Sequence, residues 1–172
     1  CAAVAAGAFH SLALTRSGRV VAWGSDGDGQ ATVPEGLRDV VAIAAGGDFS
    51  LALRSDGTVA AWGAGDAGQL DVPPGLSNVV AIAAGNYHGL ALRDDGTVVG
   101  WGGYLFSSPI VPAGLERVVA IAAGGFHNEA LVQTVPPLTN TRIESGRLQA
   151  DLNLPAGWIY QLESTRNFVD WS

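Results

Sequence analysis

A repeat of constant length governs what this chain can fold into. The residues "VVAIAAGGDFSLALRSDGTVAAWG" at 40–63 return as "VVAIAAGNYHGLALRDDGTVVGWG" at 79–102, a shift of 39 residues. The same spacing relates the glycines Gly7, Gly46, Gly85 and Gly124. The phase is kept from residue 1 to 132, so three repeats are nearly complete and a fourth stops there. A fixed period of this size is typical of chains built from stacked, similar units.

Within each repeat the local signals indicate short β-strands. An apolar run such as "VVAIAAG" ends at a glycine, and the next run alternates leucine with alanine, as in "SLAL". Asp56-Gly57 or Asp95-Gly96 follows, and glycine permits the positive φ of a two-residue hairpin turn. "TVAAWG" returns as a partner strand, and "TVP" or "DVP" is expected to form a fourth strand, which proline restricts to a sheet edge.

Four antiparallel strands in 39 residues predict one blade of a β-propeller. Both faces of the "SLAL" strand are apolar, and a blade must bury both faces between two neighbours. A two-sheet sandwich would expose one face of each strand and favour polar alternation. The predicted fold is therefore all-β, a partial β-propeller of four-stranded antiparallel blades over residues 1–132.

The motifs "GAFHSLAL", "DGTVAAWG" and "GQ", recurring in register, resemble the repeat of the regulator of chromosome condensation family. The short period and "VPxGL" resemble its compact bacterial branch, which includes a β-lactamase inhibitory protein. The resemblance covers residues 1–132 and implies a seven-bladed parent whose last blade is shared between the chain ends. We therefore expect about three and a half repeats of a longer protein. Cys1, the single cysteine, aligns with an internal strand position, which favours a fragment start over a lipidated N-terminus.

The remaining 40 residues have a different pattern. Residues 133–142 contain a proline pair and polar residues, and they are predicted to be a linker. In residues 143–172, apolar and polar residues alternate up to "PAGW" (155–158) and again after it. This alternation predicts a β-hairpin, or a β-sandwich segment that is cut short.

The histidines His10, His88 and His127 occupy one repeat position, and the fourth copy of that position is Phe49. A metal ligand does not alternate with phenylalanine, so we interpret the position as a slot for a flat ring whose polar edge bonds to the backbone. "SDGDGQ" (25–30) faintly resembles a calcium loop, but its twelfth position from Asp26 is a leucine, and turn formation explains the Asp and Gly content. No metal site is predicted.

No catalytic or cofactor-binding residue is predicted either. The serines beside the ring slot lack the Gly-x-Ser-x-Gly context of a hydrolase, and all nine basic residues are arginine, so no phosphate-binding lysine loop exists. Trp23, Trp62 and Trp101 could be a sugar-stacking set, but their fixed place before glycine favours packing between blades. A net charge of −7 without basic patches disfavours nucleic acid, and no 18-residue apolar run indicates a membrane span.

The third repeat departs from the others in one loop. "GYLFSSPIVP" (103–112) replaces polar turn residues, and Tyr104, Leu105 and Phe106 are our candidates for partner binding. The alternative is that these three side chains pack on the C-terminal β segment.

These observations predict a non-catalytic scaffold that binds a protein or a glycan, in a secreted or cell-surface bacterial protein. The alternatives are a regulator resembling the guanine-nucleotide exchange factor or the β-lactamase inhibitor of the family, and an accessory module of an enzyme whose catalytic domain lies elsewhere. The strict 39-residue period leaves no room for the β-wedge insertion that is associated with exchange activity. Open apolar blade faces also predict self-association of the chain.

Overall fold

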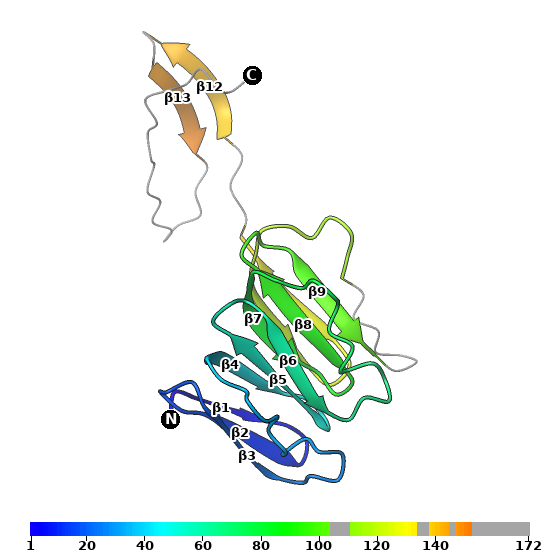
Figure 1. The fold of residues 1–172 in the computed structure, drawn as a ribbon. Coiled ribbons are helices and arrows are strands. Elements are labelled where there is room, and N and C mark those ends of the chain that lie inside the picture. Colours follow the sequence, from blue (N-terminus) through cyan, green and yellow to red (C-terminus); the bar gives the residue numbers. More distant parts are fainter. Residues whose placement is uncertain (104–110, 134–137, 145–146, 153–172) are drawn as a thin grey trace. The chain divides into compact units, whose positions relative to one another are not determined.

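The structure, a computed structural model, describes residues 1–103, 111–133, 138–144 and 147–152, and every regular element in them is a β-strand (Figure 1). The chain divides into two compact units, Cys1–Gln133 and Thr134–Ser172. We call the first the propeller unit. Among the described residues, no helix exists that could cross a membrane.

The described propeller unit contains four sheets, each built from strands that follow one another in sequence and pair antiparallel. The sheets are β1 (Ala3–Ala6), β2 (His10–Leu14) and β3 (Val20–Gly24); β4 (Val40–Ala45), β5 (Phe49–Arg54) and β6 (Val59–Gly63); β7 (Val79–Ala84), β8 (His88–Arg93) and β9 (Val98–Gly102); and β10 (Val118–Ala123) with β11 (Asn128–Val132). Each sheet is one blade, and the last holds two strands, as the sequence predicts.

The expected fourth strand of each blade is absent from the described residues, so this part of the prediction is wrong. The first three blades have three strands each. The "TVP" and "DVP" segments form local turns instead, in which Leu37 N–H donates to Pro34 O at 3.2 Å and Leu76 N–H donates to Pro73 O at 3.1 Å. A proline lacks the N–H that a strand ladder needs, and the turns satisfy the neighbouring groups locally.

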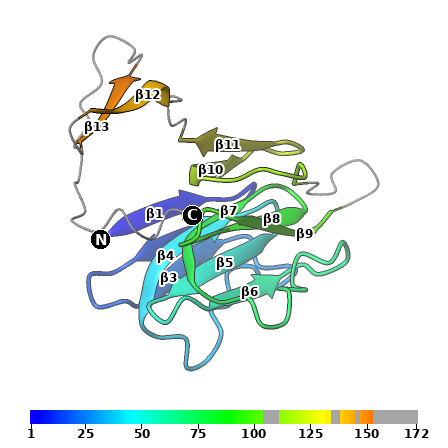
Figure 2. The ribbon, with the colours of Figure 1, turned by 90° about the horizontal axis from the view of Figure 1, so that it is seen from above.

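The blades pack face to face in chain order, as Figure 1 shows in blue, cyan and green. The innermost strands β1, β4, β7 and β10 are successive neighbours, and β10 also contacts β8 (Figure 2). Leucines of one blade meet an alanine and a tryptophan of the next: Leu12 and Leu14 pack with Ala52 and Trp62. The same positions one repeat later form the core between the second and third blades. The partial propeller is therefore confirmed, and large side chains do fill the space that small ones leave.

In the second unit, β12 (Leu138–Glu144) pairs antiparallel with β13 (Arg147–Leu152). The first strand of the hairpin predicted around "PAGW" is β13, while its turn and its second strand lie at 153–172, outside the described residues. β13 pairs with β12, whose residues 138–142 we expected to be part of a linker. Thr139, Thr141 and Ile143 are β-branched, which favours the extended backbone of a strand despite the preceding prolines.

Candidate functional site

The strand directions sort the connections of the propeller unit onto two faces. The loop face carries the connections between innermost and middle strands and the loops after the outer strands: residues 7–9, 25–30, 46–48, 64–69, 85–87 and 124–127. The turn face carries the hairpin turns and the segments that lead into the next blade: residues 15–19, 35–39, 54–58, 74–78, 93–97 and 113–117. Surface connections on a rigid frame are where binding residues gather.

Exposed aromatic rings mark the loop face. Phe9 is 75% exposed, Phe126 is 63% exposed and Tyr87 is 38% exposed. They occupy one repeat position, whose fourth copy is Asp48. The ring centroids of Tyr87 and Phe126, on neighbouring blades, lie 6.1 Å apart. This set was not predicted from the sequence, although the residue directly before the ring slot is aromatic in three of four copies.

Backbone hydrogen bonds between blades hold these connections in place. Ala8 N–H donates to Gly47 O at 3.2 Å, and Asn86 N–H donates to Gly125 O at 3.1 Å. The repeated glycines make this close approach possible, because a Cβ atom at Gly46 would lie 2.1 Å from the ring of Phe49 and 2.6 Å from Gly85 O. The hollow between the innermost strands on this face, about 260 Å³, is lined by alanine and glycine apart from Asn86, so it offers little chemistry.

The ring slot joins each blade to the next through side chains. His10 Nε2 lies 2.9 Å from Ser50 Oγ, and Ser50 Oγ donates to Gln30 O at 2.9 Å. The serine proton is thereby used, so Nε2–H of His10 is the donor. His88 Nε2 lies 2.6 Å from Asn128 Oδ1, which accepts in the same way. The expectation of a backbone partner is wrong, because the acceptor is the next blade's side chain, 40 residues along.

Burial explains why these histidines are neutral donors. His10 and His88 are only 3% and 1% exposed. Burial lowers the pKa of His10 more than the carboxylate of Asp48 raises it. Burial likewise lowers the pKa of His88 despite its hydrogen bond to Asn128. The Nδ1 atom of each ring has no hydrogen-bond partner, which a neutral ring tolerates better than a charged one.

At Phe49, the one slot position without a histidine, the next blade offers no hydrogen-bond acceptor. The residue that corresponds to Ser50 and Asn128 in the blade after Phe49 is Gly89, which has no acceptor. A Cβ atom at Gly89 would lie 2.4 Å from Cζ2 of Trp101. The slot and its neighbour therefore change together, and the histidines serve packing between separate blades. The described residues contain no group of three His, Cys, Asp or Glu side chains that could hold a metal.

Trp62 and Trp101 also join blades, as the packing interpretation predicts. Trp62 Nε1–H donates to Gln30 O at 3.0 Å, and Trp101 Nε1–H donates to Gln69 O at 2.9 Å. Both rings are about 95% buried, with 6% and 5% exposed. Trp23, on the first blade, is 52% exposed.

The loop at 25–30 is a turn, as interpreted. Asp26 Oδ1 accepts from Ala31 N–H at 2.8 Å, and Asp26 Oδ2 accepts from Thr32 Oγ1 at 2.7 Å. These hydrogen bonds lower the pKa of the exposed Asp26 carboxyl, with the Thr32 hydroxyl as the largest cause. The carboxylate that suggested a calcium loop is thus used within its own turn.

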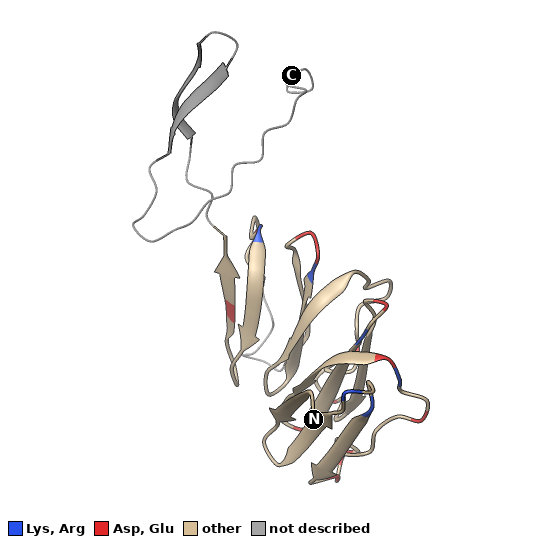
Figure 3. Ribbon diagram, turned by 90° about the vertical axis from the view of Figure 1, so that its left-hand side faces the viewer, with Lys and Arg blue, Asp and Glu red and all other residues tan. Residues whose placement is uncertain are grey.

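Charge differs between the two faces. The turn face holds all six arginines of the propeller unit, balanced by as many carboxylates: Arg16, Arg19, Arg38, Arg54, Arg93 and Arg117 against Glu35, Asp39, Asp56, Asp94, Asp95 and Glu116. Figure 3 shows the blue segments close to strand ends and turns. The loop face has no arginine and carries Asp26, Asp28, Asp48 and Asp66. A partner with a basic surface therefore matches the loop face better than the turn face.

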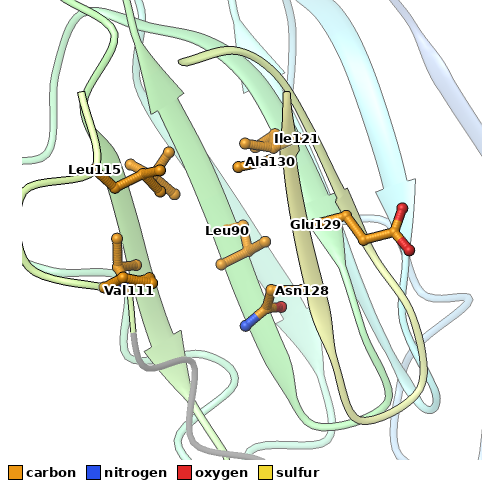
Figure 4. A pocket seen from close by; sticks show the side chains of 9 residues that line it. Leu90, Val111, Leu115, Ile121, Asn128, Glu129 and Ala130 are labelled. Atoms are coloured by element: carbon orange, nitrogen blue, oxygen red, sulfur yellow. The ribbon is translucent and has the colours of Figure 1, made fainter. Parts of the chain in front are cut away.

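An apolar pocket of about 350 Å³ lies between the third blade and the two-stranded fourth (Figure 4). Its apolar walls include Leu90, Val98, Val111, Leu115, Ile121 and Ala130. The same positions one repeat earlier pack around Trp101 in a closed core. The residue that corresponds to Trp101 in the fourth repeat is Asn140, which belongs to β12 of the second unit. The pocket thus corresponds, one repeat later, to the space that Trp101 fills between the second and third blades.

Tyr104, Leu105 and Phe106, the candidates from the sequence, lie outside the described residues. Gly103, which precedes them, follows the end of β9 and so lies on the loop face. Their role in binding stays a prediction.

Comparison with solved structures shows the same architecture in larger proteins. A chain in the structure of Kap60 bound to yeast RCC1 (Prp20) is 27% identical, with a TM-score of 0.64, covering 76% of this chain and 41% of that one. Prp20p from Saccharomyces cerevisiae is 25% identical, with a TM-score of 0.65, covering 76% of this chain and 43% of that one. The CRINKLY WD40 ectodomain of the Arabidopsis thaliana receptor kinase ACR4, at 23% identity and a TM-score of 0.65, shares the fold over 77% of this chain and 47% of its own.

This chain spans less than half of the length of each of these solved chains. None of the curated proteins matches it. The family described as "Regulator of chromosome condensation (RCC1) repeat" matches residues 1–30, 40–69 and 79–103, which are the first three blades with their loops. The three repeats within residues 1–103 of this chain are therefore RCC1 repeats.

Proposed function

We propose that this chain is a non-catalytic binding scaffold whose loop face docks a protein partner. The observation that carries this proposal is the set of exposed rings on that face, Phe9, Tyr87 and Phe126, at equivalent positions of the first, third and fourth blades. An aromatic side chain covers about 150–250 Å² when buried, and aromatic residues dominate the binding energy of many interfaces.

The loop face is also preorganised. The connections that carry the rings are fixed by hydrogen bonds between blades, and the slot residues directly behind Phe9 and Tyr87, which are His10 and His88, are buried. Binding to such a face orders few additional groups, which lowers the entropic cost of association. The acidic charge of the face favours a partner with a basic surface and speeds its encounter at low salt.

Known relatives support a protein as the partner. Yeast RCC1 (Prp20) has been crystallised with Kap60, and the structure of Prp20p was reported with its binding properties to Gsp1p and histones. Nucleotide exchange, β-lactamase inhibition, a link to an external catalytic domain and a secreted or cell-surface location all stay predictions for this chain.

The test compares the two faces. Binding proteins are selected on the immobilised chain, purified, and measured by titration against the double variant Phe9→Ala with Phe126→Ala. We expect an affinity loss of about tenfold or more. The matched control is Val41→Ala with Val80→Ala, which removes apolar side chains that are 54% and 55% exposed at the turn-face ends of β4 and β7. Partners that lose affinity for the control and not for the loop-face variant would overturn the proposal.

A further inference from the structure

A pocket of about 380 Å³ opens on the loop face, between the loops that follow β3 and β6 and the connections that precede β5 and β8. Its functional groups are three carboxylates, two amides and one aromatic ring: Asp28, Asp48, Asp66, Gln69, Asn86 and Tyr87. Two alanines complete its wall. It carries more polar side chains than the alanine and glycine hollow on the same face.

The carboxylates give this pocket a net negative charge. No arginine or histidine lines it. Asp48 accepts a hydrogen bond from Gln30 Nε2 at 3.2 Å, which is a neutral donor. Within the described structure, the side chains of Asp28 and Asp66 form neither a hydrogen bond nor an ion pair, and both residues are exposed. The pocket thus offers acceptors and charge to a cation without first breaking an internal ion pair.

A buried amide supplies a second, independent observation. Gln69 is only 3% exposed, and its Oε1 accepts from Ala67 N–H at 2.7 Å. In the preceding blade the equivalent Gln30 uses its Nε2 to bind Asp48. The equivalent of Asp48 one repeat later is Tyr87, so that carboxylate acceptor is missing, and among the described residues Gln69 Nε2 has no acceptor. Nε2 is not one of the fully buried atoms that lack a partner, so this donor of an otherwise buried side chain is accessible at the pocket, where a ligand can provide its acceptor.

We infer that this pocket receives the side chain of an arginine or lysine from an extended segment of the protein partner. The three carboxylates neutralise the cation, and Tyr87 provides an aromatic face beside it. A backbone carbonyl of the same segment accepts from Gln69 Nε2. The inference rests on the proposed function, because the pocket is part of the loop face. A neutral sugar would satisfy the amide and the ring but would leave the three carboxylates without a counter-charge.

The experiment uses the chain and a minimal probe, the peptide acetyl-Gly-Gly-Arg-Gly-Gly-amide, followed by NMR of the Gln69 side-chain amide. The comparison peptide carries citrulline, which keeps the shape of arginine and removes its charge. We expect the arginine peptide to shift the Gln69 resonance saturably and to bind about tenfold more tightly than the citrulline peptide, with the difference shrinking as salt is added.

Variants locate the effect. Asp28→Asn with Asp66→Asn should weaken binding of the arginine peptide about tenfold, whereas Asp94→Asn, which removes a charge from the turn face, should leave it unchanged. Equal binding of both peptides, or a Gln69 shift produced by methyl glucoside and not by the arginine peptide, would overturn the inference. The Phe9→Ala variant separates the two proposals, because Phe9 does not line the pocket. If the arginine peptide still binds but the partner's affinity is unchanged by Phe9→Ala with Phe126→Ala, the proposed docking face is contradicted and the arginine pocket is not.

Discussion

Replacing Ser50 with alanine tests how successive blades recognise one another. Ser50 is fully buried and makes two hydrogen bonds, one from His10 Nε2 and one to Gln30 O. Gln30 O keeps the bond from Trp62 Nε1 after the substitution. Only the His10 donor is therefore left without an acceptor, at a site where that ring is 3% exposed.

An unsatisfied buried donor costs about 1–3 kcal/mol, so Ser50→Ala should lower the free energy of unfolding by about 2 kcal/mol. His10→Phe alone keeps the bond from Ser50 to Gln30 and should cost less. The double variant imitates the natural pair Phe49 and Gly89, in which neither residue has a polar edge. It should be more stable than the sum of the single effects predicts, by about 1 kcal/mol or more.

The assay is urea unfolding of all four forms, followed by tryptophan fluorescence and circular dichroism, with equal slopes required before the free energies are compared. Trp62 reports on this contact, because it bonds to the same carbonyl. Additive effects within about 0.5 kcal/mol would show that the two residues do not act as a pair. The idea of a matched slot would then be refuted even if each single variant were destabilised.

Three further predictions concern stability and association. Burial lowers the pKa of His10 and His88 below 6.5, so the unfolded chain binds more protons near that pH, and the free energy of unfolding should fall as the pH drops below about 6.5. Glutamine at positions 10 and 88 should flatten this dependence in unfolding curves. Gly46→Ala should cost about 3 kcal/mol in the same assay because its Cβ would overlap Phe49, whereas Gly27→Ala, with open space around it, should change little. Trp23 is 52% and Leu131 63% exposed on the terminal blades, so sedimentation should show concentration-dependent association that glutamine at both positions reduces; a monomer at every concentration would contradict this.

The blade architecture could be predicted from the sequence because each strand assignment must hold in every copy of the repeat. A strand assignment that fits 40–63 must also fit 79–102, and the leucine and alanine alternation fixes which faces meet. The number of strands per blade was harder. Val33 favours a strand, whereas Pro34 has no N–H to donate to a neighbouring strand. Only the three-dimensional structure shows that Pro34 O accepts from Leu37 N–H in a local turn.

The candidate site was less predictable, because its meaning depends on which residues become neighbours across blades. The pairing of His10 with Ser50 spans 40 residues, one more than the period, and it becomes visible only when the middle strands are placed side by side. The exposure of Phe9 and Phe126 has the same origin: composition cannot distinguish a ring on the loop face from one in the core. From the sequence alone, the candidate was therefore the loop that departs most from the repeat, at Tyr104, Leu105 and Phe106.

Adjacent positions of this repeat obey opposite constraints, and we place the proposed binding face at the position that packing does not fix. The ring slot holds His, Phe, His and His, and where the next blade is described, its residue there matches the slot: an acceptor for His10 and His88, a glycine for Phe49. The position directly before the slot holds Phe, Asp, Tyr and Phe, and its contacts differ between copies: Asp48 accepts from Gln30, whereas Tyr87 lies beside Phe126 of the next blade. Packing fixes the first position, because a mismatch there buries an unsatisfied group or creates a clash. The second position is exposed or half-buried, so it can change between blades without loss of stability, and its mixture of rings and charge is available for recognition.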